Sequence, residues 1–155
     1  MRRKDRERDA AFALEVLRDC EYAAFATVNT DGKTPYCILI SPVLINNSVY
    51  FHCAKEGQKI DNIKKNNSVC ISCARNTKLV GFTTEYESAV VFGKCEIVPD
   101  ENETEKIMAL RAIGEKYAKD NMHNFEAHTD KFLSATCICR VDIEKITGKE
   151  AKVKQ

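Results

Sequence analysis

Three apolar stretches in the first third of the chain decide the fold: residues 22–29 (YAAFATVN), 36–45 (YCILISPVLI) and 49–53 (VYFHC). Each is rich in aromatic and β-branched residues, which favour strands. Asp31-Gly32 follows the first stretch and Asn46-Asn47 follows the second, so short turns connect all three. Strands joined by short turns pair antiparallel, and Pro42 predicts a bend, a bulge or an edge in the second.

The rest of the chain alternates helices with further strands. We expect strands at residues 68–74, 88–98 and 135–146, and helices at residues 9–21, 57–65 and 101–117. Asp100 is the predicted N-cap of the last helix, with Glu103 completing a capping box. Gly93 is the predicted bulge or close-approach point, residues 75–85 form a loop or short strand, and residues 121–134 fit no clear pattern. The fold class is therefore mainly β with flanking helices: six or so strands, mostly antiparallel, in a small barrel or a strongly coiled sheet, with one domain over residues 1–155.

Composition excludes several classes of protein. The chain has 155 residues, of which 44% are hydrophobic, and 24 basic against 23 acidic side chains give a net charge of +1. This balance gives no electrostatic reason to expect nucleic acid as a partner. No apolar stretch approaches the roughly 20 residues of a membrane span, and no secretion signal precedes the first helix. We expect a cytoplasmic protein that binds neither nucleic acid nor membrane.

Eight cysteines invite a zinc or disulfide interpretation. Cys70-x-x-Cys73 and Cys137-x-Cys139 offer four ligands on paper. Both pairs lie in predicted strands, however, where residues three apart point to opposite faces. We therefore expect no metal site, and thiols that serve as small buried hydrophobes.

A set of ordered motifs resembles a known family. The motifs lie at residues 2–6 (RRKDR), 31–36 (DGKTPY), 50–63 (YFHCAKEGQKIDNI), 88–93 (SAVVFG) and 146–149 (ITGK). Together they resemble the 5-nitroimidazole resistance proteins, which belong to the pyridoxamine 5'-phosphate oxidase-like superfamily. The resemblance implies a six-stranded Greek-key split β-barrel that forms a homodimer. It also implies FMN at the subunit interface, with FAD as an alternative cofactor.

The predicted phosphate site lies where the third strand runs into the short helix. A Gly57-bearing turn, a helix N-terminus and Lys59 together offer the N–H donors and the cation that a phosphate needs. The resemblance adds Cys53 and Gln58, at positions where the superfamily has a hydroxyl residue and a basic residue. Because neither replacement brings a positive charge, Lys59 is the one fixed cation expected at this spot.

The remaining candidate site residues lie on three strands. If Phe51 is in the core, strand alternation directs His52 outward, and the resemblance places a histidine here beside flavin and substrate. His52 is therefore the candidate for substrate positioning or proton delivery. The resemblance implies that the isoalloxazine ring lies along Tyr36, Ile38 and Ile40, with Ser88 as a polar contact.

Together with these residues, the resemblance implies a flavoprotein that reduces a small organic acceptor, such as a 5-nitroimidazole or another nitroaromatic compound. The flavin carries the redox chemistry, so no catalytic triad is required. The alternative is a non-catalytic protein of the same fold that binds or senses flavin or haem, with His52 or another histidine as axial ligand. Oxidation of pyridoxamine 5'-phosphate is disfavoured, because Gln58 replaces a basic residue.

Overall fold

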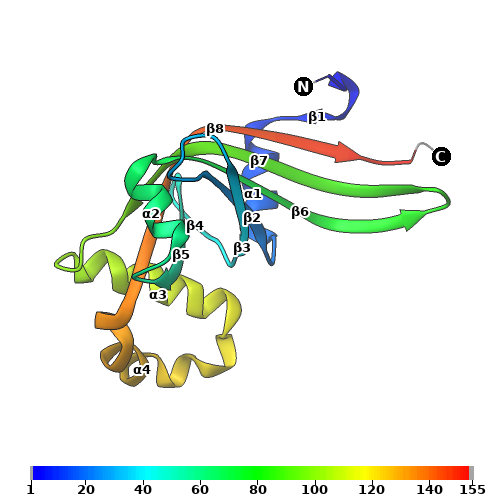
Figure 1. Ribbon diagram of the computed structural model, residues 1–155. Helices are drawn as coiled ribbons and strands as arrows, with labels where there is room; N and C mark the ends of the chain where they lie inside the picture. Colours follow the sequence, from blue (N-terminus) through cyan, green and yellow to red (C-terminus); the bar gives the residue numbers. More distant parts are fainter. Residues whose placement is uncertain (1, 154–155) are drawn as a thin grey trace.

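The computed structural model describes residues 2–153, which fold into one antiparallel sheet with helices around it (Figure 1). In chain order the elements are η1 (Lys4–Arg6), β1 (Glu7–Arg8), α1 (Ala10–Asp19), β2 (Ala23–Val28), β3 (Pro35–Ile40), β4 (Val43–Ile45), β5 (Ser48–Ala54), α2 (Gln58–Lys65), β6 (Ser68–Val80), β7 (Thr83–Ile97), α3 (Glu103–Tyr117), η2 (Lys119–Asn124), α4 (Phe125–Phe132), η3 (Leu133–Ala135) and β8 (Thr136–Ala151). Within the described part, no helix is both long and apolar enough to cross a membrane.

The sheet is a barrel that hydrogen bonds do not close. Its strand order is β3-β2-β6-β7-β8-β5-β4, with β1 paired to β8. The two ends of this order, β3 and β4, are consecutive in the chain and are joined only by Ser41 and Pro42. The prediction of an antiparallel split barrel with flanking helices is thus confirmed.

The prediction of six strands is wrong, because the sheet has eight. The expected strand at residues 36–45 is divided into β3 and β4. Pro42 has no N–H to give to a ladder, so the chain leaves one end of the sheet there and joins the other. The other unpredicted strand is β1, a two-residue segment in which Glu7 and Arg8 pair with the end of β8. It is too short for periodicity to indicate.

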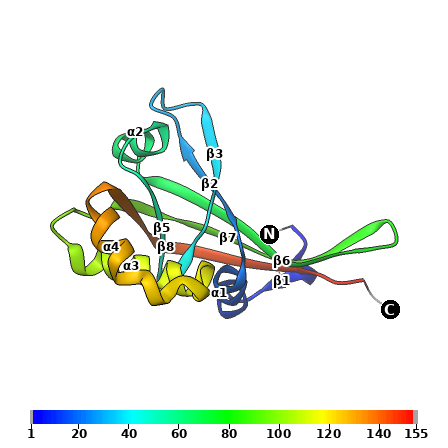
Figure 2. The ribbon, with the colours of Figure 1, turned by 90° about the horizontal axis from the view of Figure 1, so that it is seen from below.

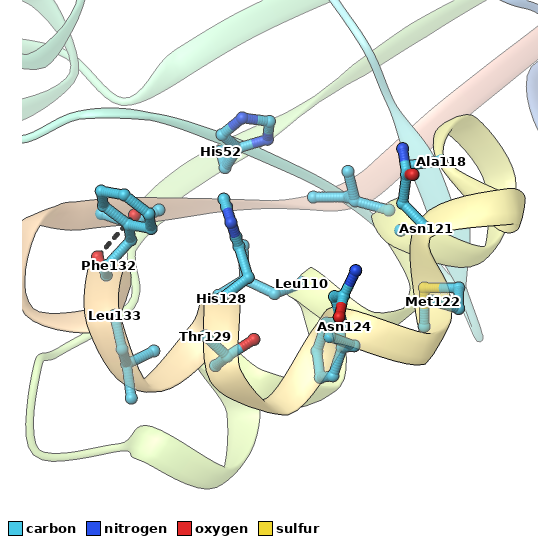
Figure 3. A pocket seen from close by; sticks show the side chains of 14 residues that line it. His52, Leu110, Ala118, Asn121, Met122, Asn124, His128, Thr129, Phe132 and Leu133 are labelled. Atoms are coloured by element: carbon cyan, nitrogen blue, oxygen red, sulfur yellow. Dashed lines mark hydrogen bonds between the residues drawn. The ribbon is translucent and has the colours of Figure 1, made fainter.

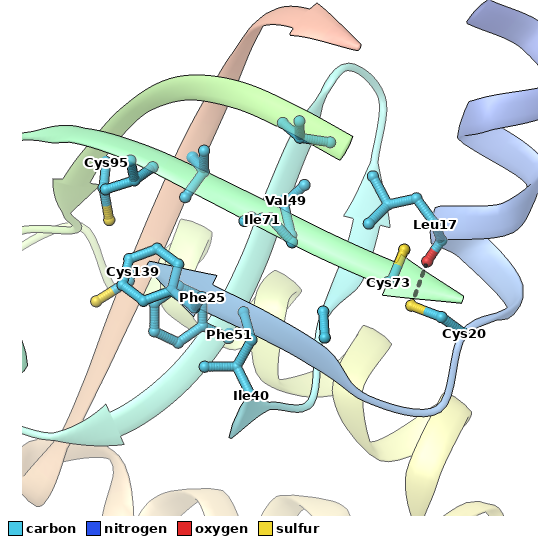
Figure 4. Packing of buried hydrophobic residues seen from close by; sticks show 14 of the residues in the cluster. Leu17, Cys20, Phe25, Ile40, Val49, Phe51, Ile71, Cys73, Cys95 and Cys139 are labelled. Carbon is cyan, nitrogen blue, oxygen red and sulfur yellow. Dashed lines mark hydrogen bonds between the residues drawn. The ribbon is translucent and has the colours of Figure 1, made fainter. Parts of the chain in front are cut away.

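Two hydrophobic clusters lie on opposite faces of the sheet. The larger fills the barrel and includes Phe25, Phe51 and Ile71, all at most 1% exposed, with α1 packed against it (Figure 4). The rings of Phe25 and Phe51 meet with their centroids 4.9 Å apart. The smaller cluster lies on the outer face of β4, β5 and β8, where Tyr50 and Ile138 are buried beneath α3.

The hairpin of β6 and β7 is longer than the sequence suggests and extends away from the barrel (Figure 2). Residues 75–85, expected as a loop or short strand, form its outer half, with a register shift between Arg75 and Lys78. The predicted irregularity at Gly93 is confirmed, since the register with β8 shifts there. A Cβ on Gly93 would also collide with the carbonyl oxygen of Asp142.

The start of α3 differs from the prediction. Asn102, not Asp100, is the N-cap, because its Oδ1 accepts a hydrogen bond from the backbone N–H of Glu105. The side-chain amide of Asn102 in turn donates to the Glu105 carboxylate. Asp100 instead accepts hydrogen bonds from Lys55 and from the buried Lys106. These ion pairs lower the pKa of Asp100 to about 2, with Lys106 as the larger cause. The carboxylate therefore connects α3 to the end of β5 instead of capping the helix.

Candidate functional site

A surface hollow of about 340 Å³ lies between the end of β3, the end of β5 and the start of α2. The residues that line it are Tyr22, Leu39, Ile40, Ser41, His52 and Lys59. Strand alternation explains why β5 contributes His52, because Phe51 points into the barrel and is 1% exposed. The hollow thus brings together three of the predicted site residues: Ile40, His52 and Lys59.

Lys59 is the cation of this hollow. Its side chain is half-buried, and Nζ lies 5.6 Å from the ring centroid of Phe51. Within residues 2–153 it forms no ion pair with a carboxylate. Lys59 is therefore available for an external anion.

The helix that carries Lys59 adds hydrogen-bond donors. α2 begins after Gly57, whose φ of 118° is open to glycine alone in practice, and no side chain caps the helix. The first N–H groups of an uncapped helix have no intrahelical partner, and the helix dipole makes this end attractive to anions. The start of α2 has the donors and the charge that a phosphate group requires.

Cys53 is half-buried at the end of β5, and its Sγ lies 4.0 Å from Sγ of Cys139. Hydrogen bonds with the thiols of Cys137 and Cys139, aided by the charge of Lys59, hold the pKa of Cys53 well below its usual range. A cysteine side chain is also a weak hydrogen-bond donor toward a phosphate oxygen in comparison with a hydroxyl group. Cys53 therefore contributes less to an anion site than a hydroxyl residue would, and Lys59 carries that contact.

Gln58 is engaged with its own chain. Its Nε2 donates to Oδ1 of Asn29 at 2.9 Å, and Nδ2 of the buried Asn62 donates to the same oxygen at 3.0 Å. Asn62 also donates to Oγ1 of Thr27 at 3.0 Å. This network attaches α2 to the end of β2. Gln58 thus positions the helix that carries Lys59.

His52 also lines a second and larger cavity, of about 720 Å³, between β5, α3 and α4. Most of the lining is apolar and comes from side chains such as Leu110, Ile113 and Phe132. Figure 3 shows His128, on α4, pointing toward His52 across this cavity. The His128 ring packs against Phe132, with the centroids 4.7 Å apart. His52 is thus the residue shared by the hollow and the cavity.

The other predicted flavin contacts lie further away. Tyr36 and Ile38 are half-buried on β3, on the same side of the strand as Ile40, but they do not line the hollow. Ser88 lies on β7 opposite Ala74 and Lys149, on the outer face of the sheet. A single chain does not bring Ser88 to the hollow.

The lining residues that were not predicted as site residues from the sequence include Tyr22, Leu39 and Ser41 in the hollow, and His128 in the cavity. Tyr22 and Leu39 are large and are 55% and 71% exposed, a combination that only the structure reveals. His128 lies in the stretch at residues 121–134, where no clear period appears. The residues that follow α3 form η2 and α4 there, and they fold back over β5.

Comparison with protein families identifies the fold family. Residues 9–150 match the family model described as pyridoxamine 5'-phosphate oxidase, which is nearly the whole chain. The chain belongs to this family. A search of the curated proteins finds no match. Family membership accounts for the split barrel.

Solved structures with the same fold include a candidate resistance protein and proteins that bind FAD or heme. A candidate 5-nitroimidazole antibiotic resistance protein from Bacteroides thetaiotaomicron is 26% identical, with a TM-score of 0.78 over 92% of this chain and 84% of that chain. A FAD-binding protein from Mesorhizobium loti is 22% identical, with a TM-score of 0.66 over 95% and 98%. A FAD and heme binding protein from Mycobacterium smegmatis is 19% identical, with a TM-score of 0.77 over 96% and 74%. The last two comparisons bear on the fold alone.

Proposed function

We propose that the protein is an FMN-dependent reductase of small organic acceptors such as nitroaromatic compounds. The observation that carries the proposal is the position of His52, which lines both the Lys59 hollow and the larger apolar cavity. A cofactor in the hollow and an acceptor in the cavity would both touch this side chain. FMN, when bound and first reduced by an external electron donor, would supply the electrons for the reduction.

The residues present fit a flavin phosphate. Lys59 offers a cation without a carboxylate partner in the described part of the chain, and the uncapped start of α2 offers N–H donors. Above this end of the hollow, Leu39 and Ile40 provide an apolar surface that suits an aromatic ring. FMN carries one phosphate and FAD carries two. This hollow offers one anion-binding site, which favours FMN over FAD.

The chemistry assigned to His52 is proton delivery or acceptor positioning. Its side chain is exposed, and an imidazole ring can both donate and accept a proton. Reduction of a nitro group consumes protons as well as electrons, and a positioned acid next to the acceptor supplies them. The apolar side chains of the cavity hold the acceptor and exclude water.

We further propose that the protein acts as a homodimer, with the flavin at the subunit interface. The outer face of β3, β2, β6 and β7 carries Leu39 and Phe92, which are 71% and 46% exposed. Between them lie Ala24, Ala26 and Val90, so the face is broadly apolar. Leu39 also lines the hollow, so a second copy on this face would cover a flavin bound there.

The experiment that tests this function is an absorption spectrum of the purified protein, taken before and after anaerobic reduction, followed by addition of a nitroaromatic compound. We expect a flavin spectrum that bleaches on reduction and returns when the compound is added. A protein that binds no flavin after reconstitution with FMN would contradict the proposal. If the compound does not reoxidise the reduced flavin, the protein binds flavin but is not a reductase of such compounds.

One observation favours haem binding as a second candidate. His52 and His128 both line the apolar cavity, and a pair of histidines can ligate haem iron from both sides. The same spectrum distinguishes the candidates, because haem gives an intense Soret band that flavin lacks. A Soret band that disappears in both His52→Ala and His128→Ala would support the haem assignment.

A further inference from the structure

Three thiols converge where β5 pairs with β8. The register places Phe51 opposite Cys139 and Cys53 opposite Cys137, so alternation directs all three cysteines to the inner face. Their Sγ atoms all lie within 4.8 Å of one another, and those of Cys53 and Cys139 are 4.0 Å apart. Within the described residues, this is the one group of three potential metal ligands so close together.

The spacing is close to what a metal ion requires. Three thiolates bound tetrahedrally at about 2.3 Å from zinc lie about 3.8 Å from one another. One of the three separations is already 4.0 Å, and none exceeds 4.8 Å. Side-chain shifts well below the length of one bond would place a metal ion at the centre of the three sulfur atoms.

The ligand type selects the class of metal. All three donors are sulfur, and soft thiolate ligands favour Zn²⁺ and Cu(I) over Mg²⁺ or Ca²⁺. Two of the ligands, Cys137 and Cys139, are 5% and 0% exposed, so they are fixed by the packing of β8. Lys59, beside Cys53, offsets part of the negative charge that three thiolates bring.

An ion can also reach the site. Cys53 is half-buried, and Cys137 lines a small hollow of about 180 Å³ beside Ile60 and Val98. A small ligand entering from this hollow could complete a fourth coordination position. Sites with three protein ligands commonly leave that position to water or an exchangeable ligand.

We propose that Cys53, Cys137 and Cys139 form a three-thiolate site for one soft metal ion, Zn²⁺ or Cu(I). The assignment replaces, for these three residues, the expectation that the cysteines only fill space. It shares Lys59 with the flavin proposal but does not require that a flavin be bound. The sequence does not suggest this set, because Cys53 is far from Cys137 along the chain and only the pairing of β5 with β8 joins them.

The test is a titration of the reduced, metal-free protein with Cd²⁺ as a probe for Zn²⁺, and separately with Cu(I). The chain has no tryptophan, so thiolate-to-metal charge-transfer absorption in the near ultraviolet is easily measured. We expect absorption that saturates at one equivalent per chain for at least one of the two ions. Absorption that fails to appear, or rises without saturating, overturns the proposal.

Two variants make the assignment specific. Cys53→Ser removes a half-buried ligand while keeping a small polar side chain, and we expect at least a tenfold loss of metal affinity. Cys70→Ser is the matched control, because Cys70 is half-buried on the outer face of β6 and lies outside the cluster; it should titrate like wild type. Equal titrations for all three proteins, with thermal melts showing that they are folded, would contradict the site. FMN content, measured in parallel, reports on the flavin proposal separately.

Discussion

The outer side of the sheet is covered by a helix over one half and exposed over the other. Over β4, β5 and β8, α3 covers the sheet and buries Tyr50 and Ile138. Over the outer side of β3, β2, β6 and β7 no helix within residues 2–153 is packed, since α1 meets β6 and β7 from the barrel side, and Leu39 and Phe92 remain exposed. The hollow that contains His52 and Lys59 lies at the boundary between the two faces. In the dimer proposed above, a second copy of the chain would cover this exposed face as α3 covers the other one.

The largest expected effect comes from charging the uncovered face. Leu39→Glu combined with Phe92→Glu would place unpaired carboxylates in the proposed dimer interface, at a cost of about 3–5 kcal/mol. We expect the dissociation constant of the dimer to rise by about a hundredfold or more, measured by analytical ultracentrifugation. Met108→Glu, on the exposed side of α3, is the control and should remain dimeric. A wild-type chain that is monomeric at micromolar concentration would contradict the account of this face.

The covered face should respond through stability instead of assembly. Ile138 is 0% exposed beneath α3, so Ile138→Ala leaves a cavity there. We expect the free energy of unfolding to fall by about 2–5 kcal/mol, measured by urea denaturation, with the oligomeric state unchanged. A loss below about 1 kcal/mol would mean that α3 is not firmly packed on this face.

Removing the cation at the boundary should weaken cofactor binding. Lys59→Ala deletes the proposed charge-assisted contact with the phosphate, which is worth about 1.5–3 kcal/mol. We expect FMN to bind about ten to a hundred times more weakly in a fluorescence titration. Lys64→Ala, an exposed lysine of the same helix, should bind FMN as wild type does. Equal affinities for both variants would remove Lys59 from the site.

The smallest expected effect is a pH dependence on the covered face. Burial, and a hydrogen bond that Tyr50 donates to Glu105, raise the pKa of Tyr50 to about 12. The unfolded chain ionises its tyrosines near pH 10, so deprotonation favours the unfolded state between about pH 10 and 12. The stabilisation is therefore complete below pH 10 and is lost as the pH rises toward 12. Tyr50→Phe should show a smaller loss across this window in denaturation measured at several pH values; an identical loss would contradict the assignment.

The sequence predicted the parts of the fold that depend on local pattern. The strands around residues 22–29 and 49–53, and the helix at residues 57–65, follow from alternation and turn residues, and all three are present. The division at Pro42 was visible as a bend, but the sequence does not show that the two halves pair at opposite ends of the sheet. That outcome depends on barrel closure, which is a long-range property.

As with the fold, the features of the site that depend on local pattern were predictable, and those that depend on long-range contacts were not. Strand alternation was enough to place His52 outward and Phe51 inward. The role of Gln58 was not predictable, because its partners Asn29 and Asn62 come from other parts of the chain. His128 was missed because residues 121–134 carry no regular period, and only the packing of α4 beside β5 brings it to the cavity. The local sequence pattern therefore does not predict contacts between segments that are distant along the chain.

The central claim is that His52 connects the cofactor to the acceptor, and stopped-flow reoxidation of the reduced flavin by a nitroaromatic compound tests it most directly. We predict that His52→Ala binds FMN nearly as wild type does but is reoxidised about a hundredfold more slowly. His123→Ala is the matched control, because the His123 ring contacts Asp120 and Asn124 on η2 and lines neither cavity; it should react at the wild-type rate. Equal reoxidation rates for wild type, His52→Ala and His123→Ala, at equal flavin content, would contradict the claim.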